Sequence, residues 1–515
     1  ASSLWQVANG GPVWLSIYYD DNDWINPAMN AELVIDRLRE TGHERFESNM
    51  GSKGHCGSFD SNAAYRFFDG KATDPHPPHV HYRTNTLRYN RAFWVSIDRL
   101  ALQNRWASID ADTTSAGLVV ETDGVLGFTL DLGHRPGPSA LRIDGGEMIT
   151  VPAAKISFDA VLDAQHRRQA WELRASQTNS ELRKSPTLSG TFAEALRGPF
   201  TVIYGTASGT RAANSANPDW VAAQHFATEW NAYMILHWGR QKPPADRGHD
   251  WWAPPYPFKP GGMVPPNQAT VTPIADIELT LGGIPRERNL IIFGDIGSNW
   301  ITNQLATDLP VTLTADGVKV GDRNHKGAHV RYLITVPNPL APERYAVFAK
   351  GYLSSRVDAN ALSVKDVGKD LEGLPFFWPD YVVWDARKKL NDTVQPPMKY
   401  LPDAYVEAGF FAEDWTLDST APVPHATFDG QRVHLSAIDA PGGFGVSQIE
   451  YQLDGGDWQA YAHPFTLSGD AGQILSVRAT DQNGRFDYRG VRGAQRGFPA
   501  RGNTSKPRSF RVPAR

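Results

Sequence analysis

The 515-residue sequence contains a single cysteine, Cys56. One cysteine excludes an internal disulfide framework and any metal site built from paired cysteines. It follows His55 in a glycine-rich stretch, residues 54–57, and the sequence shows no base arranged to activate it. We therefore interpret Cys56 as a small packed side chain rather than a nucleophile.

Long apolar runs and an excess of positive charge are also missing. No apolar stretch approaches the roughly 18 residues that a membrane-spanning helix requires. The formal net charge is −5, from 51 basic and 56 acidic residues, and this balance does not indicate nucleic acid as a partner. No cofactor motif is present either. We expect a protein with no nucleic-acid partner, no membrane span and no cofactor.

Tryptophan, proline and glycine are plentiful, with 16, 37 and 46 residues. The rest of the composition is ordinary for a globular protein. Together these features indicate a loop-rich, β-containing protein of extracellular type. Residues 1–3 suit a processed N-terminus, so we expect the protein to be secreted or periplasmic.

The hydrophobic patterns predict a multidomain fold of α/β and β parts. Residues 1–73 have the pattern of the C-terminal end of a parallel α/β sheet, and residues 196–401 that of a second α/β domain. Short alternating segments predict a β-sandwich over residues 82–185 and an Ig-like β-sandwich with a tail over residues 420–515.

The first seventy residues have the most informative order of elements. A buried strand is predicted over residues 12–19, and an acidic cluster, residues 20–23, follows it. An amphipathic pattern over residues 27–42 predicts a helix that begins at a proline and ends at a glycine. A second strand over residues 46–50 then leads into a glycine-rich loop that contains His55.

Asp21, Asp23 and His55 are the candidate catalytic residues. A carboxylate at a strand end can orient a histidine and stabilise its imidazolium form, and a histidine on a glycine-rich loop can approach a serine. In α/β-hydrolases the triad acid also precedes the histidine in the chain. The alternative is that the acids cap a helix and His55 is an ordinary loop histidine.

Residues 1–70 resemble the C-terminal third of secreted α/β-hydrolases of the prolyl-oligopeptidase and polyhydroxybutyrate-depolymerase-like group. Residues 21–27 take the place of the acidic turn of that family, residues 41–43 of the helix end, and residues 53–55 of the histidine loop. The resemblance implies the C-terminal portion of an α/β-hydrolase sheet. It also implies a Ser-His-Asp triad, with His55 as the base and Asp21 or Asp23 as the acid.

Weaker similarity extends beyond the first seventy residues. Residues 90–95, 289–294, 336–345 and 378–383 are similar to segments that follow the hydrolase domain in large bacterial secreted members. The last predicted sandwich resembles Ig-like modules of bacterial surface proteins.

No Gly-x-Ser-x-Gly motif, the signature of the hydrolase nucleophile, occurs in the sequence. Residues 205–209 and 294–298 follow buried strands but lack that spacing, and we interpret them as turns. The nucleophile belongs before the acid in chain order. We therefore expect the serine on a missing N-terminal segment or a companion chain. The complete enzyme is expected to act on ester or peptide bonds of an extracellular polymer. The alternative function is a non-catalytic extracellular protein that binds a polysaccharide or a partner.

Three weaker candidate sites have simpler interpretations. His76, His79 and His81 have spacing that could hold zinc or copper, and in an extended strand His79 and His81 would share a face, but we favour a linker with incidental histidines. The aromatic segment 251–258 could stack a sugar ring, although packing over a domain is favoured. The turn from Asp454 to Asp457 could bind calcium, although a hairpin is favoured.

Overall fold

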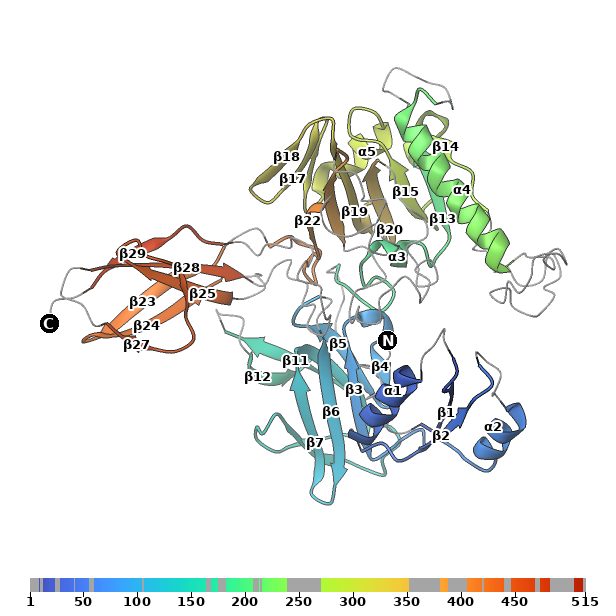
Figure 1. Ribbon diagram of the computed structural model, residues 1–515, viewed down its shortest axis with the longest axis vertical. Helices are drawn as coiled ribbons and strands as arrows, with labels where there is room; N and C mark the ends of the chain where they lie inside the picture. Colours follow the sequence, from blue (N-terminus) through green and yellow to red (C-terminus); the bar gives the residue numbers. More distant parts are fainter. Residues whose placement is uncertain are drawn as a thin grey trace. The chain divides into compact units, whose positions relative to one another are not determined.

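A computed structural model shows the arrangement of the chain (Figure 1). It describes residues 9, 13–23, 28–40, 42–54, 60–103, 106–163, 168–174, 182–206, 213, 215–238, 270–351, 380–387, 405–418, 421–439, 446–467, 473–481 and 504–512. These residues form two compact units, one up to Arg174 and one from Leu182 onward. Strands dominate and form seven sheets in the described residues, which confirms a sheet-rich, multidomain fold. None of the described helices is both long enough and apolar enough to cross a membrane.

The first unit begins with a strand, a helix and a second strand, as predicted. β1 (Leu15–Asp20) pairs in parallel with β2 (Phe46–Gly51), and α1 (Met29–Glu40) connects them. α1 buries Ile35 and Leu38, and the chain leaves the helix at Gly42 with φ of +70°. α2 (Ser61–Phe68) follows, with its first turn capped by the Asp60 carboxylate.

A β-sandwich forms the rest of the first unit. Its sheets run in the orders β10-β9-β7-β6-β3 and β12-β11-β8-β5-β4, and the helix η3 (Leu87–Tyr89) joins β3 to β4. The first sheet contains β3 (His79–Thr84), β6 (Ala107–Thr114), β7 (Gly117–Asp123), β9 (Ser139–Ile143) and β10 (Ile149–Val151). The second contains β4 (Arg91–Ala92), β5 (Val95–Leu100), β8 (Val125–Asp131), β11 (Lys155–Leu162) and β12 (Arg168–Leu173). Alternate residues such as Ile97, Ile109 and Phe128 face inward and form one buried core.

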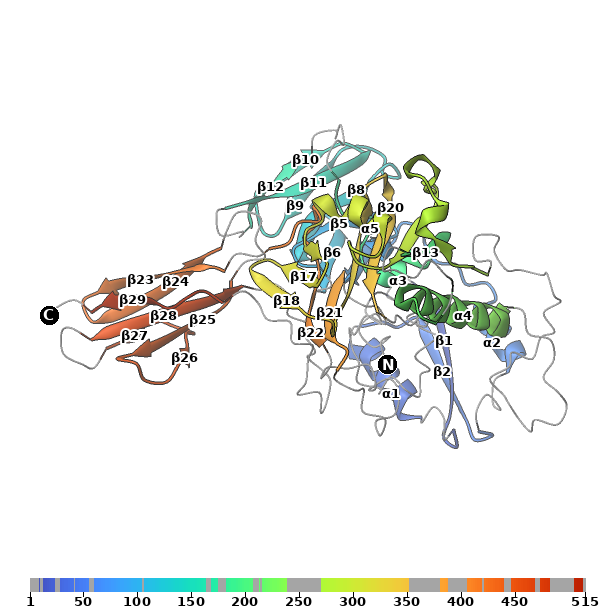
Figure 2. The ribbon, with the colours of Figure 1, turned by 90° about the horizontal axis from the view of Figure 1, so that it is seen from above.

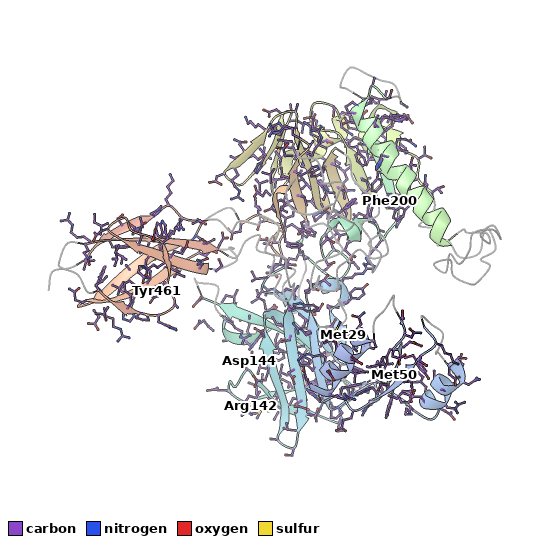
Figure 3. The ribbon with its side chains drawn as sticks, in the orientation of Figure 1. Met29, Met50, Arg142, Asp144, Phe200 and Tyr461 are labelled. Atoms are coloured by element: carbon purple, nitrogen blue, oxygen red, sulfur yellow. The ribbon has the colours of Figure 1, made fainter. Side chains whose placement is uncertain are left out.

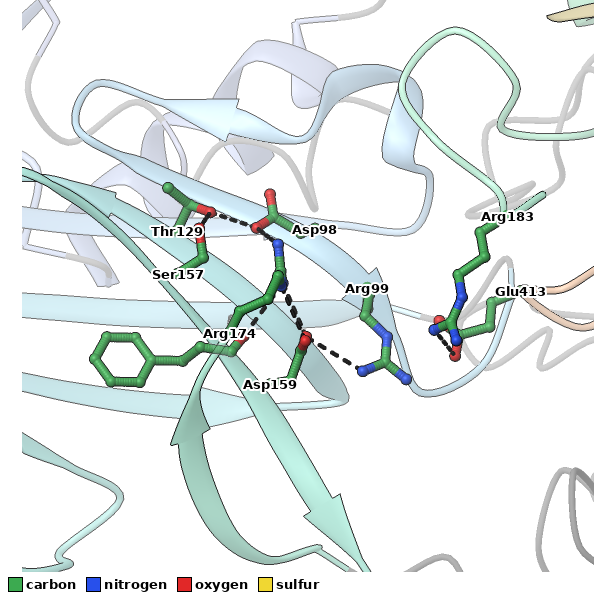
Figure 4. Close-up of polar contacts among 9 residues, drawn as sticks. Asp98, Arg99, Thr129, Ser157, Asp159, Arg174, Arg183 and Glu413 are labelled. Carbon is green, nitrogen blue, oxygen red and sulfur yellow. Dashed lines mark hydrogen bonds and ion pairs between the residues drawn. The ribbon is translucent and has the colours of Figure 1, made fainter. Parts of the chain in front are cut away.

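An ion-pair network stabilises the second sheet of this sandwich (Figure 4). The Arg174 guanidinium binds both oxygens of Asp159 at 2.9 Å and Asp98 Oδ2 at 3.0 Å. Burial opposes ionisation of Asp159, but hydrogen bonds and charge from Arg174 outweigh it and hold the pKa of Asp159 below its ordinary value. Arg174 therefore joins the end of β12 to β11 and β5.

The second unit contains a seven-stranded sheet in the order β14-β13-β15-β20-β19-β21-β22. Its strands are β13 (Phe200–Tyr204), β14 (Ile274–Ala275), β15 (Asn289–Phe293), β19 (Val330–Asn338), β20 (Ala341–Lys350), β21 (Tyr381–Asp385) and β22 (Tyr405–Gly409). The pairs from β14 to β20 are parallel, as predicted. The sheet becomes antiparallel from β20 onward because β19 and β20 form a hairpin.

Short elements and helices complete this α/β part. α4 (Pro218–Trp238) packs against β13, as Figure 1 shows. β13 and β15 are buried along their whole length, as is usual for parallel strands covered on both faces. The other elements are α3 (Phe192–Ala195), η5 (Asp276–Glu278), η6 (Leu281–Gly283), α5 (Trp300–Leu305), η7 (Ala306–Asp308), β16 (Thr312–Thr314), β17 (Gly317–Val320) and β18 (Arg323–Lys326).

The C-terminal part is a small sandwich of two sheets (Figure 2). One sheet contains β23 (Val423–Asp429), β24 (Arg432–Ile438) and β27 (Phe465–Thr466). The other contains β25 (Val446–Leu453), β26 (Gln459–Ala460), β28 (Ile474–Asp481) and β29 (Arg508–Arg511). The predicted turn after β25 is confirmed: Asp454 and Gly455 both have positive φ, and the Gly456 N–H donates to the Leu453 carbonyl.

Candidate functional site

The Asp20 carboxylate joins the ends of β1 and β2. Asp20 is the last residue of β1 and is only 4% exposed. Its carboxylate accepts hydrogen bonds from the backbone N–H groups of Asn22 at 3.0 Å, Lys53 at 2.8 Å and Gly54 at 2.9 Å. One charged group thus holds the turn after β1 against the loop after β2.

The predicted acids lie in the turn that Asp20 organises. Asp21 is exposed, whereas Asp23 is 9% exposed and its N–H donates to the Asp20 carbonyl at 3.3 Å. A Cβ on Gly54, which has φ of +84°, would lie 3.8 Å from the Asn22 carbonyl oxygen. The residue before His55 therefore adjoins the turn between the two candidate acids.

His55 and Cys56 lie outside the described residues, as does the aromatic segment 251–258. The sequence interpretation did not assign a role to Asp20. Its position indicates such a role, because Asp20 is the last residue of an apolar strand. A carboxylate at that position lies beside the loops at the carboxyl end of a parallel sheet.

A second polar centre lies at the carboxyl ends of β13 and β15. Asp219, in the first turn of α4, is 8% exposed, and no described residue donates a hydrogen bond of regular geometry to its Oδ2. The Ser298 hydroxyl lies beside this carboxylate. A Cβ on Gly205 would lie 2.4 Å from the Ser298 carbonyl oxygen, and one on Gly294 would lie 2.6 Å from Asp219 Oδ2. Gly205 and Gly294, the first residues of the two segments noted in the sequence, thus both lie beside this carboxylate.

The electrostatics of this centre raise the pKa of Asp219 above that of an exposed aspartate. Burial raises the pKa of Asp219 to about 6, opposed by the Ser298 hydroxyl and reinforced by the charge of Asp295. Asp295 itself pairs with Lys350 at 2.8 Å. No described residue forms a hydrogen bond with the buried Tyr332 hydroxyl, and burial raises its pKa well above the ordinary value. Asp219 can therefore exchange a proton near neutral pH.

Histidines and aspartates meet on the outer face of the first sandwich. His79 and His81 extend from the same side of β3, as the sequence predicted, and Asp110 lies on the neighbouring strand β6. His79 Nε2 lies 2.8 Å from Asp110 Oδ1, and His81 Nδ1 lies 2.7 Å from Asp110 Oδ2. His76 is not part of this group, because its ring stacks on His134 at 4.1 Å.

Three aspartates, Asp418, Asp439 and Asp481, also gather in the second unit. They are 6%, 3% and 0% exposed, and one carboxylate oxygen of each lies within 4.8 Å of the others. Carboxylate oxygens at these separations could hold a hard cation such as Ca²⁺. By contrast, the Asp454 carboxylate accepts from the Ile474 N–H at 2.8 Å, as a group that holds the hairpin in place would do.

Comparisons of the chain with protein-family models, curated proteins and solved structures found no match.

Proposed function

We propose that residues 13–60 supply the acid and the base of a Ser-His-Asp hydrolase that cleaves ester or peptide bonds. The observation that carries the proposal is the binding of the Lys53 and Gly54 amides by Asp20. These bonds hold the start of the His55 loop at the carboxyl end of β1. We expect the next residue, His55, to pair with a carboxylate in the turn that follows β1.

The chemistry assigned to this arrangement is acyl transfer. The His55 imidazole removes the proton of a serine hydroxyl while the serine oxygen attacks the carbonyl carbon of the substrate. The imidazolium then gives that proton to the leaving alcohol or amine. A water molecule then attacks the acyl-serine ester while His55 takes a proton from the water. The carboxylic acid product leaves, and the imidazolium returns that proton to the serine oxygen.

Burial favours Asp23 as the carboxylate that stabilises the imidazolium. A triad acid acts from a buried position, where its interaction with a charged imidazole is least screened by water. Asp23 is 9% exposed, whereas Asp21 is exposed. Asp20 is assigned a positioning role, because its oxygens already accept three backbone hydrogen bonds.

We assign the serine to a companion hydrolase segment. In the described part of the chain, β1 and β2 pair only with each other, and Met50 on β2 is 61% exposed (Figure 3). Isolated two-stranded sheets are marginally stable, and parallel strands are normally covered on both faces. Further strands beside this pair would stabilise the sheet and supply the nucleophile. The proposed setting is outside the cytoplasm, on an ester- or peptide-linked polymer.

The test uses the full chain isolated from its native host together with any chain that accompanies it. A fluorophosphonate probe should label a serine in the assembly, and His55→Ala should abolish both labelling and hydrolysis of p-nitrophenyl esters or peptide anilides. Asp23→Asn should lower turnover by about 10⁴-fold, as expected when a triad histidine loses its carboxylate. His434→Ala, at an exposed position on β24, is the matched control and should retain full turnover.

Two outcomes would contradict the proposal. Full turnover by the His55→Ala assembly would remove this histidine from the chemistry. An assembly in which the probe labels no chain would favour the alternative function, a non-catalytic protein that binds a polysaccharide or a partner.

A further inference from the structure

The strand register places four potential metal ligands on one outer face of the first sandwich. β3 and β6 are antiparallel, with His79 opposite Asp112 and His81 opposite Asp110. Because side chains alternate along a strand, all four extend from the same face of the sheet. Glu121, on β7, lies opposite Asp110 and extends the acidic part of this face.

The ligand atoms are close enough to share one ion. His79 Nε2 and one carboxylate oxygen each of Asp110 and Asp112 all lie within 4.8 Å of one another. Ligands at about 2.0–2.2 Å from a zinc ion are separated by comparable or shorter distances. The side chains are partly exposed, with His79 at 53% and Asp110 at 40%, so an ion reaches them directly from solvent.

His81 contacts the Asp110 carboxylate at the oxygen that does not face His79. Its Nδ1 lies 2.7 Å from Asp110 Oδ2, while Asp110 Oδ1 faces His79. The two histidines thus fix the orientation of the Asp110 carboxylate, and a group that orients a ligand in this way supports metal binding.

We propose that His79, Asp110 and Asp112 bind one divalent transition-metal ion of the zinc or copper type, with His81 as the residue that orients Asp110. Imidazole together with carboxylate favours Zn²⁺ or Cu²⁺ over Mg²⁺ and Ca²⁺. Metal binding requires His79 Nε2 without a proton, so any proton held there is released to water as the ion binds. Water completes the coordination on the solvent side.

The proposed ion would join an edge strand to its sheet. β3 is the last strand in the order β10-β9-β7-β6-β3, so it is paired on one side only. Its second edge pairs with no strand in the described residues, although the Asn9 side chain binds the backbone N–H and carbonyl of Arg83 there. A metal bound across β3 and β6 stabilises that pairing and raises the unfolding temperature of the sandwich in proportion to its occupancy.

The test is titration of the metal-free full chain with Zn²⁺ by calorimetry, and with Co²⁺ by absorption spectroscopy. We expect one saturable site at which Zn²⁺ competes with Co²⁺, together with a rise in the first unfolding transition that EDTA reverses. Asp112→Asn tests the site without disturbing the fold, because no hydrogen bond to the Asp112 side chain is found in the described residues. His81→Ala should weaken binding by about 10–100-fold, the effect of removing a group that orients a ligand.

Matched controls separate this site from other ligands on the chain. His434→Ala on β24 and Asp123→Asn on β7 change the same residue types elsewhere and should leave the affinity unchanged. The proposal is overturned if Zn²⁺ shows no saturable binding. It is also overturned if His79→Ala and Asp112→Asn, both folded by circular dichroism, bind Zn²⁺ as tightly as the unchanged chain.

Discussion

The Gly54 N–H donates a hydrogen bond of 2.9 Å to Asp20 Oδ1, although 34 residues separate them in the chain. Parallel pairing of β1 with β2 makes this contact, because it places Asp20 opposite Gly51 at the same edge of the sheet. The same carboxylate accepts from Lys53 and Asn22. Asp20 therefore holds together the two loops that carry the proposed acid and base.

Replacing Asp20 should loosen both loops. Asp20→Ala leaves three backbone N–H groups without their acceptor, and we expect the free energy of unfolding to fall by on the order of 3 kcal/mol. Hydrogen exchange at the Lys53 and Gly54 amides should accelerate. Asp21→Ala, at an exposed position, is the stability control and should change stability by less than about 0.5 kcal/mol. Unchanged exchange at the two amides in Asp20→Ala would contradict this role.

Asp219 should make the second unit less stable as the pH rises. Its pKa is about 6 in the folded protein against an ordinary value of 3.8, so the folded state holds the proton more tightly. The cost of ionising it, about 3 kcal/mol, is fully present above pH 6 and disappears as the pH falls towards 4. Asp219→Asn should therefore be more stable than the unchanged chain at high pH only. Urea unfolding at several pH values tests this, and a difference that does not vary with pH would refute it.

Lys184 and Asp380 form a buried ion pair in the second unit. Their side chains are 1% and 0% exposed, and Nζ lies 2.5 Å from Oδ2. Lys184→Met should cost about 3–5 kcal/mol, because it leaves the Asp380 carboxylate buried without its cation. Adding Asp380→Asn to that variant should restore part of the loss. Lys326→Met, at an exposed position on β18, is the control, and equal losses in the two lysine variants would contradict the prediction.

Arg174 should contribute more to the first sandwich than its neighbour Arg99. Arg174 binds both Asp98 and Asp159, whereas Arg99 pairs with Asp159 at 3.2 Å (Figure 4). Arg174→Met should lower the free energy of unfolding by about 2 kcal/mol, and Arg99→Met by less than about 1 kcal/mol. Denaturant unfolding of the two variants tests the order, and a larger loss in Arg99→Met would reverse it.

Local sequence patterns determined the elements of this fold. The apolar spacing of Ile35 and Leu38 predicted α1, and the glycine at position 42 predicted where the chain leaves it. The Asp454-Gly455 pair predicted a hairpin, since both residues adopt the positive φ that the turn requires. Such signals are visible in the sequence because they depend on neighbours within one turn or one strand.

The candidate sites depend on strand pairing, which the sequence does not show directly. The sequence alone indicated acids near residue 20 and a shared face for His79 and His81. Only the tertiary structure selected Asp20 as the group that binds the loop after β2, and only the register of β3 with β6 placed Asp110 beside both histidines. Pairing and register arise from contacts between residues far apart in the chain, whereas periodicity reports only which face of an element each residue occupies.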